Sequence, residues 1–190
     1  MNLLDDINNK FNESSQIILD SKNLSEKIEE VINAITDRLT RGKKIIIFGN
    51  GGSAADSQHI AAELIGRFQM ERSGIPAISL TTDSSILTAL GNDYSNDVIF
   101  SRQCESLVND DDVVIGISTS GNSLNVFNAI ISSKKRNAFC IGLLGNDGGI
   151  IKDKVDIALI APSSNTARIQ EVHRVIYHII CEMIEKKWTK

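Results

Sequence analysis

His59 and Glu63 are the first pair of residues in this sequence that could do chemistry. They are four residues apart, so on a helix their side chains project from one face. An imidazole and a carboxylate together can bind a divalent metal ion or exchange protons with a substrate. Such pairs are more often surface contacts than sites. This pair follows a glycine-rich loop, and that position favours a functional role.

The glycine-rich loop runs from Gly49 to Ser53. Glycines let the backbone approach a ligand closely, and the helix that follows offers free N–H groups to an anion or a hydroxyl. Gly49, Gly51 and Ala54 also fit a dinucleotide-binding pattern. Two helices before the first strand, and no acidic residue at a strand end about 20 residues later, argue against it, so no nucleotide cofactor is expected. The simpler interpretation makes Ser53 a helix N-cap, with Asp56 completing a capping box.

A second polar loop carries four hydroxyl groups, on Ser118, Thr119, Ser120 and Ser123. Hydroxyls, backbone N–H groups and a helix N-terminus can hold a phosphate without a lysine. The lysine of a P-loop is missing, which disfavours hydrolysis of a nucleoside triphosphate. The simpler interpretation is a polar turn with Ser123 as N-cap, but four hydroxyls exceed what a cap requires. The loop therefore predicts a site for a phosphate monoester.

The last 25 residues hold two of the three histidines, His173 and His178. Apolar residues cover a wide face of this segment, which predicts a well-buried helix over about 166–187. By default a histidine on such a helix is a core residue with a hydrogen-bond partner. By itself this segment identifies no site.

The elements that must position these residues alternate in type. The first 40 residues show the apolar spacing of two helices, separated at residues 21–23. Further along, short apolar runs predict strands near 43–48, 77–80, 112–117, 138–143 and 157–160. Helical segments lie near 53–67, 84–91, 98–108, 123–136 and 166–187. This alternation predicts an α/β fold with a parallel sheet flanked by helices. The loops at 49–53, 118–123 and 145–149 would then meet at the carboxyl edge, where such sheets bind ligands.

Composition limits the class of protein. With 190 residues, 42% hydrophobic and 23% charged, the chain predicts one globular domain over 1–190, with helices in 1–40 and an α/β core with a C-terminal helix in 41–190. A net charge of −4 argues against nucleic-acid binding. We find neither a signal peptide nor a membrane-spanning run, and no membrane partner is expected. Three scattered cysteines form no disulfide or metal motif, which favours buried thiols and a cytoplasmic location.

Five stretches, taken together and in order, resemble a known family. They are Gly49-Asn50-Gly51-Gly52-Ser53-Ala54-Ala55-Asp56-Ser57-Gln58-His59, Leu80-Thr81-Thr82-Asp83, Gly91-Asn92-Asp93-Tyr94, Gly116-Ile117-Ser118-Thr119-Ser120-Gly121-Asn122-Ser123 and Thr166-Ala167-Arg168-Ile169-Gln170-Glu171-Val172-His173. The sequence resembles the phosphoheptose isomerases, within the group of sugar isomerase (SIS) domains. The resemblance implies a flavodoxin-like SIS fold with an N-terminal helical extension and a long C-terminal helix.

The resemblance also implies an activity. The family converts sedoheptulose 7-phosphate to D-glycero-D-manno-heptose 7-phosphate, for the heptoses of bacterial lipopolysaccharide. Glu63 would be the general base and His178 the general acid. This agrees with the chemistry, because aldose–ketose isomerisation through an enediol needs a base near the carbon and an acid near the carbonyl oxygen. The implied substrate contacts are Asn50, Gly51, Gly52, Ser53, Asn92, Asp93, Ser118, Thr119, Ser120, Ser123 and Gln170.

Zinc and a tetramer follow from the same resemblance. The matching ligands of one zinc ion per subunit are His59, Glu63, Gln170 and His178. Whether the ion assists the reaction, stabilises the protein or only occupies the site stays open. Gln170 and His178 are separated by about 12 Å of helix rise, so they reach one ion only by leaning towards it. A homotetramer with shared active sites would give the N-terminal helices a partner to pack against.

Two other classes of function compete with the isomerase. Some relatives are non-catalytic adaptors that bind a replication initiator protein, and such an adaptor should have lost an acid/base residue. Here Glu63 and His178 are both present, which favours the enzyme. A sugar-phosphate sensor usually carries a DNA-binding domain, for which this chain has no room.

Overall fold

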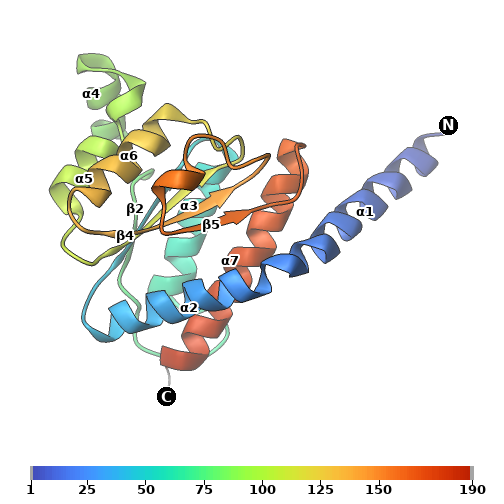
Figure 1. The fold of residues 1–190 in the computed structure, drawn as a ribbon, viewed down its shortest axis with the longest axis horizontal. Helices are drawn as coiled ribbons and strands as arrows, with labels where there is room; N and C mark the ends of the chain where they lie inside the picture. Colours follow the sequence, from blue (N-terminus) through green and yellow to red (C-terminus); the bar gives the residue numbers. More distant parts are fainter. Residues whose placement is uncertain (1, 189–190) are drawn as a thin grey trace.

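A five-stranded parallel sheet forms the centre of the computed structural model, which describes residues 2–188 (Figure 1). Its strand order is β2-β1-β3-β4-β5, and every neighbouring pair is parallel. The sheet strands are β1 (Ile45–Gly49), β2 (Ala77–Ser79), β3 (Val113–Ser118), β4 (Phe139–Leu144) and β5 (Ile157–Ile160). After β2 the chain returns to the other side of β1, so the direction of winding reverses between β1 and β3. Ligand sites of open α/β sheets lie at such a reversal.

Helices cover both faces of the sheet. They are α1 (Leu3–Asp20), α2 (Ser25–Thr40), α3 (Gly52–Ile65), α4 (Ser84–Asp93), α5 (Ser101–Leu107), α6 (Leu124–Lys134) and α7 (Thr166–Trp188). Short 3₁₀ helices lie at η1 (Ser21–Leu24), η2 (Asn96–Val98) and η3 (Lys152–Lys154). The apolar faces of α2, α3 and α7 share one core with the sheet, and α5 and α6 share a second core with its other face. Burial on both faces explains why the strand sequences are continuous apolar runs.

The sequence-based prediction of the α/β fold is confirmed, with strand boundaries displaced by two residues or fewer. The helix predicted over 98–108 begins later, at Ser101. The reason is local, because residues 96–98 form the 3₁₀ helix η2, where the Ser95 hydroxyl accepts a hydrogen bond from Asp97 N–H (3.2 Å). All three cysteines are buried and unpaired, as predicted. Within residues 2–188, every helix is too short or too polar to cross a bilayer.

The first half of α1 extends away from the rest of the fold (Figure 1). No residue of α1 is buried, whereas Ile17 and Ile18 near its end pack against the core. Large apolar side chains of the first three turns are exposed: Leu3, Leu4, Ile7 and Phe11. Because they recur at three- and four-residue spacing, they form one apolar stripe that is exposed in the monomer.

A buried ion pair joins the amino ends of β1 and β3. The Asp112 carboxylate, 2% exposed, accepts hydrogen bonds from the backbone N–H groups of Lys44 (3.1 Å) and Asn109 (2.8 Å) and pairs with the Lys44 ammonium. The Lys44 side chain is 22% exposed, so loss of Asp112 would cost the hydrogen bonds of its carboxylate more than it would strand a buried charge. This pair lies at the opposite end of the strands from the polar loops. Its loss should therefore affect stability without affecting the loops.

Candidate functional site

The turn from β1 into α3 is made by glycine rather than by a side-chain cap. Gly51 is the N-cap residue and has a φ of 54°, in the left-handed region that favours glycine. A Cβ on Gly49 would lie 2.8 Å from the Ser53 Cβ, so this position also needs glycine. The interpretation of Ser53 as N-cap, with Asp56 completing a capping box, is wrong. Ser53 lies buried in the first turn, and Asp56 faces α7 instead.

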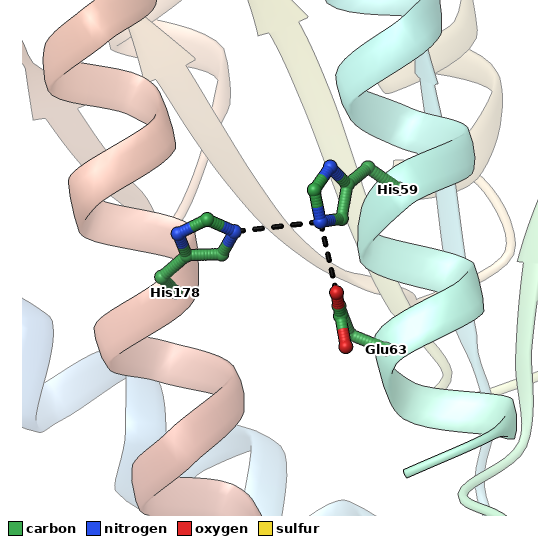
Figure 2. A group of neighbouring side chains, drawn as sticks. All are labelled: His59, Glu63 and His178. Atoms are coloured by element: carbon green, nitrogen blue, oxygen red, sulfur yellow. Dashed lines mark hydrogen bonds and ion pairs between the residues drawn. The ribbon is translucent and has the colours of Figure 1, made fainter. Parts of the chain in front are cut away.

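Helices α3 and α7 run side by side in the same direction and contact each other at regular intervals (Figures 1 and 2). Both sets of contact residues are spaced about one helical turn apart, so each turn of α3 meets one turn of α7. From the start of α3 the contacts are Gly52 with Gln170, Asp56 with Arg174, and His59 with His178. Residues more than 100 positions apart in the sequence therefore line one helix–helix contact, which we call the α3–α7 seam.

His59, Glu63 and His178 converge at the lower end of this seam (Figure 2). The His59 Nε2 atom is 2.9 Å from Glu63 Oε1 and 3.4 Å from His178 Nε2. One donor atom from each residue lies within 4.8 Å of those of the other two. The side chains of His59 and Glu63 are 37% and 23% exposed, so solvent and small molecules can reach them. The structure thus brings together three of the residues singled out in the sequence.

Aromatic rings surround the two imidazoles. The Tyr177 ring lies 5.5 Å from His59 and 4.7 Å from His178, and the Phe68 ring lies 5.6 Å from His178. The Tyr177 hydroxyl is 3.2 Å from the buried Asp56 carboxylate. Burial, together with the charge of Asp56, raises the pKa of Tyr177 to about 12. Tyr177 therefore stays neutral and serves to hold the imidazoles.

Electrostatics keep His178 neutral. Burial lowers the pKa of His178 below its usual value, and the neighbouring His59 lowers it further, whereas the charge of Glu63 opposes both. A neutral imidazole has one N–H donor and one free lone pair. It can therefore bind a metal ion, or donate and accept a proton, at neutral pH.

The donor set fits a zinc ion. Two imidazole nitrogens and a carboxylate oxygen form the ligand set of zinc sites with one open position. Bonds of about 2.05 Å at a tetrahedral angle place two ligand atoms about 3.3 Å apart. The distance between the Nε2 atoms of His59 and His178 is 3.4 Å. Gln170 lies further up the seam, where a Cβ on Gly52 would be 2.4 Å from its Nε2 atom, so its role as a ligand stays a prediction.

The hydroxyl-rich loop between β3 and α6 is compact. The Ser118 hydroxyl is 3.0 Å from that of Ser123 and 3.5 Å from that of Ser120. Ser123 occupies the N-cap position, as the simpler interpretation predicts, but its side chain does not bond the helix N–H groups. The Ser118 hydroxyl therefore faces those of Ser120 and Ser123 instead of capping α6. At the start of the helix the Val126 N–H donates to the Asn125 side chain (2.9 Å), and the positive end of the helix dipole points at the loop.

The loop at 145–149 packs directly against the hydroxyl-rich loop. Gly121 has a φ of 66°, and a Cβ there would lie 2.3 Å from the carbonyl carbon of Gly148. The Asn146 side chain donates to the Thr119 carbonyl oxygen (2.9 Å). Two backbones in contact leave little freedom, so the positions of the hydroxyl groups are set before any ligand binds.

The glycine-rich and hydroxyl-rich loops are joined by two side-chain amides. Asn50 donates to Asn125 Oδ1 (2.8 Å), and Asn125 donates to Asn50 Oδ1 (3.0 Å). Four residues of the site were not predicted from the sequence: Asn125, Phe68, Arg174 and Tyr177. Asp56 was assigned to a capping box, whereas it binds Arg174 and Tyr177. Two of these residues could have been suspected from their positions: Tyr177 directly precedes His178, and Asp56 closely follows the glycine-rich loop. The partners of the others became visible only in three dimensions.

A cavity of 480 Å³ opens beside the glycine-rich loop. Its lining includes Asn50 and Gly51 together with Gly91 at the end of α4. The predicted substrate contacts Asn92 and Asp93 directly follow Gly91, and their exposed side chains hydrogen-bond to each other (2.8 Å). Their role as substrate contacts stays a prediction.

Comparisons with known proteins give a consistent result. The family model for the SIS domain matches residues 10–145. The phosphoheptose isomerase of Geobacter sulfurreducens is 50% identical over 186 residues, which is 97% of this chain and 98% of the relative. Among solved structures, the phosphoheptose isomerase of Neisseria gonorrhoeae has a TM-score of 0.92 at 40% identity, covering 97% of this chain and 100% of that one. That of Francisella tularensis has a TM-score of 0.94 at 37% identity, covering 98% and 100%.

The contacts between the three site residues predict opposite pKa changes in two variants. In the protein without metal, we expect His178 to titrate below the ordinary value of about 6.5. Glu63→Gln should lower this pKa further, because it removes the charge that favours the imidazolium. His59→Asn should raise it, because it removes a neighbouring positive charge. NMR titration of ¹⁵N-labelled histidines measures both, and changes of the same sign in the two variants would contradict the geometry.

Proposed function

Because this chain belongs to the SIS-domain family and, within it, to the phosphoheptose isomerases, we propose that it converts sedoheptulose 7-phosphate to D-glycero-D-manno-heptose 7-phosphate. The observation that carries this proposal is the convergence of Glu63 and His178 from two helices that lie more than 100 positions apart in the sequence. A carboxylate and an imidazole are the two groups that an aldose–ketose isomerisation requires.

In the proposed reaction Glu63 removes a proton from C1 of the ketose. The electron pair forms a C1–C2 double bond, and the carbonyl oxygen on C2 takes a proton from the His178 N–H, which gives the enediol. Glu63 then returns its proton to C2 while His178 takes the proton of the C1 hydroxyl, so the aldose forms and both residues are restored. A neutral His178 suits both steps, because it can donate first and accept afterwards.

The phosphate group of the substrate is proposed to bind at the hydroxyl-rich loop. Its donors would be the hydroxyls of Ser118, Thr119, Ser120 and Ser123, with the start of α6 adding a favourable field. The glycine-rich loop, with Asn50, Gly51, Gly52 and Ser53, would contact the sugar, and Gln170, Asn92 and Asp93 would complete the contacts. Because the support of the hydroxyl-rich loop is rigid, little conformational entropy is lost when phosphate binds.

We also propose one zinc ion per subunit, held by His59, Glu63 and His178, with Gln170 as the fourth ligand. When bound there, zinc would polarise the carbonyl oxygen of the substrate. A Glu63 side chain that donates to a metal ion is a weaker base. Glu63 would thus serve both as a zinc ligand beside His59, whose Nε2 lies 2.9 Å from its Oε1 atom, and as the base.

We also propose an assembly state, a domain organisation and a cellular location for the enzyme. The exposed apolar stripe of α1 supports a homotetramer with shared sites, in which neighbouring subunits cover that stripe. Helices α2 and α7 share one core with the sheet, which supports a single domain over 1–190. Buried, unpaired cysteines support a cytoplasmic location. The product would supply heptose for lipopolysaccharide.

The proposed activity is tested directly with sedoheptulose 7-phosphate. We expect the parent protein to form the aldose phosphate, and the folded variants Glu63→Gln and His178→Gln to lose about 10²–10⁴-fold in kcat, because each removes one proton-transfer group. NMR or mass-resolved detection follows the product. The control is Glu182→Gln, which removes a carboxylate on α7 that pairs with Lys186, and which should keep full activity.

Failure of the folded parent protein to turn over this substrate, with and without added zinc, would contradict the proposal. It would instead favour the non-catalytic adaptor.

Zinc binding makes a separate prediction. His59→Gln and His178→Gln should each weaken Zn²⁺ affinity at least tenfold, because each removes one of the converging donor atoms. Competition with a chromophoric chelator measures the affinity, and Glu182→Gln again serves as the control. Equal Zn²⁺ affinities in the parent protein and in all three variants would contradict a zinc site at these residues.

The apolar stripe of α1 predicts the effect of charge on assembly. Ile7→Asp and Phe11→Asp should each lower the molecular mass in solution, because a buried carboxylate in an apolar contact is costly. Asn8→Asp adds the same charge at an exposed polar position of the same helix and should leave the mass unchanged. Light scattering coupled to size exclusion measures the mass. An unchanged mass in the first two variants would show that the stripe is not an interface.

A further inference from the structure

Two buried charges lie just outside the candidate site. Arg72 belongs to the irregular segment between α3 and β2, and Glu185 belongs to α7. Their side chains are only 2% and 1% exposed, and Arg72 Nε lies 3.1 Å from Glu185 Oε1. Burying two charges is costly unless each is fully hydrogen-bonded, so the pattern of their other partners shows what the pair holds in place.

Arg72 binds the last carbonyl groups of α3. One guanidinium nitrogen donates to the Glu63 carbonyl oxygen (2.8 Å), and the other donates to those of Leu64 (2.8 Å) and Gly66 (3.0 Å). The last carbonyls of a helix lack intrahelical partners, and a cation there is favoured by the helix dipole. The guanidinium therefore fixes the backbone of the residue that carries the proposed general base.

Glu185 orders the segment that follows α3. Its carboxylate accepts hydrogen bonds from the backbone N–H groups of Phe68 (2.9 Å), Gln69 (2.7 Å) and Met70 (2.9 Å). Burial alone would raise the pKa of Glu185, but these N–H groups and Arg72 hold it below its usual value, so the group is an anion at neutral pH. Phe68, bound in this way, places its ring against His178.

The same two helices carry the proposed acid and base. Glu185 follows His178 by seven residues, so both lie on one face of α7, two turns apart. Arg72 holds the end of α3 through the Glu63 carbonyl, and Glu185 holds Arg72. The pair thus links the two helices at the end of the seam next to the candidate site.

We propose that Arg72 and Glu185 form a positioning pair that sets the distance and orientation between Glu63 and His178. Neither residue needs to touch the substrate. A displacement of about 1 Å between reacting groups can cost 10²-fold in rate, so holding two helix ends has a catalytic effect. The catalytic part of this inference rests on the proposed function, whereas the geometric part does not.

The geometric part is tested on the three imidazoles by ¹⁵N-histidine NMR. Glu185→Gln removes the charge with little change in shape, and Arg72→Lys keeps the charge but loses the planar fork that reaches four carbonyl oxygens. In both variants we expect the resonances of His59 and His178 to move. Those of His173, which is buried and hydrogen-bonded to the Leu144 carbonyl oxygen (2.8 Å), should stay in place.

Asp112→Asn is the matched control, because it removes an ion-paired carboxylate that is as buried as Glu185 (2% exposed) but lies away from the candidate site. It should lower stability without moving the resonances of His59 or His178. Unchanged His59 and His178 resonances in folded Glu185→Gln and Arg72→Lys, or equal movement in the control, would overturn the inference. This readout needs neither turnover nor metal, so it still decides the inference if the proposed function fails.

The catalytic part is tested by kinetics well below the unfolding midpoint. We expect Glu185→Gln and Arg72→Lys to lower kcat about tenfold or more. The KM for the sugar phosphate should stay within about twofold of the parent value, because the hydroxyl-rich loop belongs to another part of the fold. Asp112→Asn should keep the parent kcat despite its lower stability. A purely structural role for the pair would lower the unfolding midpoint and leave kcat unchanged.

Discussion

The packing of α3 against α7 is the contact on which the candidate site depends. Each helix buries an apolar face against the same side of the sheet, and this places their polar edges next to each other. The contacts repeat turn by turn, so one helix cannot slide along the other without breaking several of them together. His59 and Glu63 come from one side of this seam, and His178 comes from the other. Hydrophobic burial far from any substrate therefore supplies the accuracy that proton transfer requires.

The polar groups within the seam make its alignment specific. Asp56 is buried and shared by Arg174 and by the Tyr177 hydroxyl, both at 3.2 Å. Such an arrangement is favourable only while all its members are bonded, so a shifted seam would leave a buried carboxylate without partners. The Arg72–Glu185 pair applies the same principle at the lower end of the helices. Apolar packing brings the helices together, and the buried charges select one relative position.

The other half of the candidate site lies where the direction of winding reverses, between β1 and β3. The ends of β1 and β3 are adjacent, and each continues into a polar loop and a helix N-terminus. The paired amides of Asn50 and Asn125 join the two loops, and the close backbone contact of Gly121 with Gly148 supports them. A phosphate group and a sugar could therefore be held at this edge while the acid and base act from the α3–α7 seam. In the proposed reaction the phosphate is held by the loop after β3, whereas the proton transfers are carried out from α3 and α7.

Local patterns determined much of this protein. The alternation of apolar runs predicts the strands and helices, since burial on both faces of a parallel strand leaves a continuous signal in the sequence. The four-residue spacing of His59 and Glu63 and the hydroxyls of residues 118–123 are likewise local features, and they identify candidate residues directly. The resemblance of ordered motifs adds His178 and Gln170, which spacing alone does not connect to them.

Tertiary structure alone decided which of these side chains meet. The contact of His178 with His59, the place of Gln170 beside Gly52, and the bonds of Glu185 to the segment after α3 each join residues more than 100 positions apart. Ser53 shows the same limit at short range, because a glycine with positive φ took the N-cap position that the serine could have filled. Such contacts depend on how helices pack across the sheet, and no periodicity along the chain records that packing.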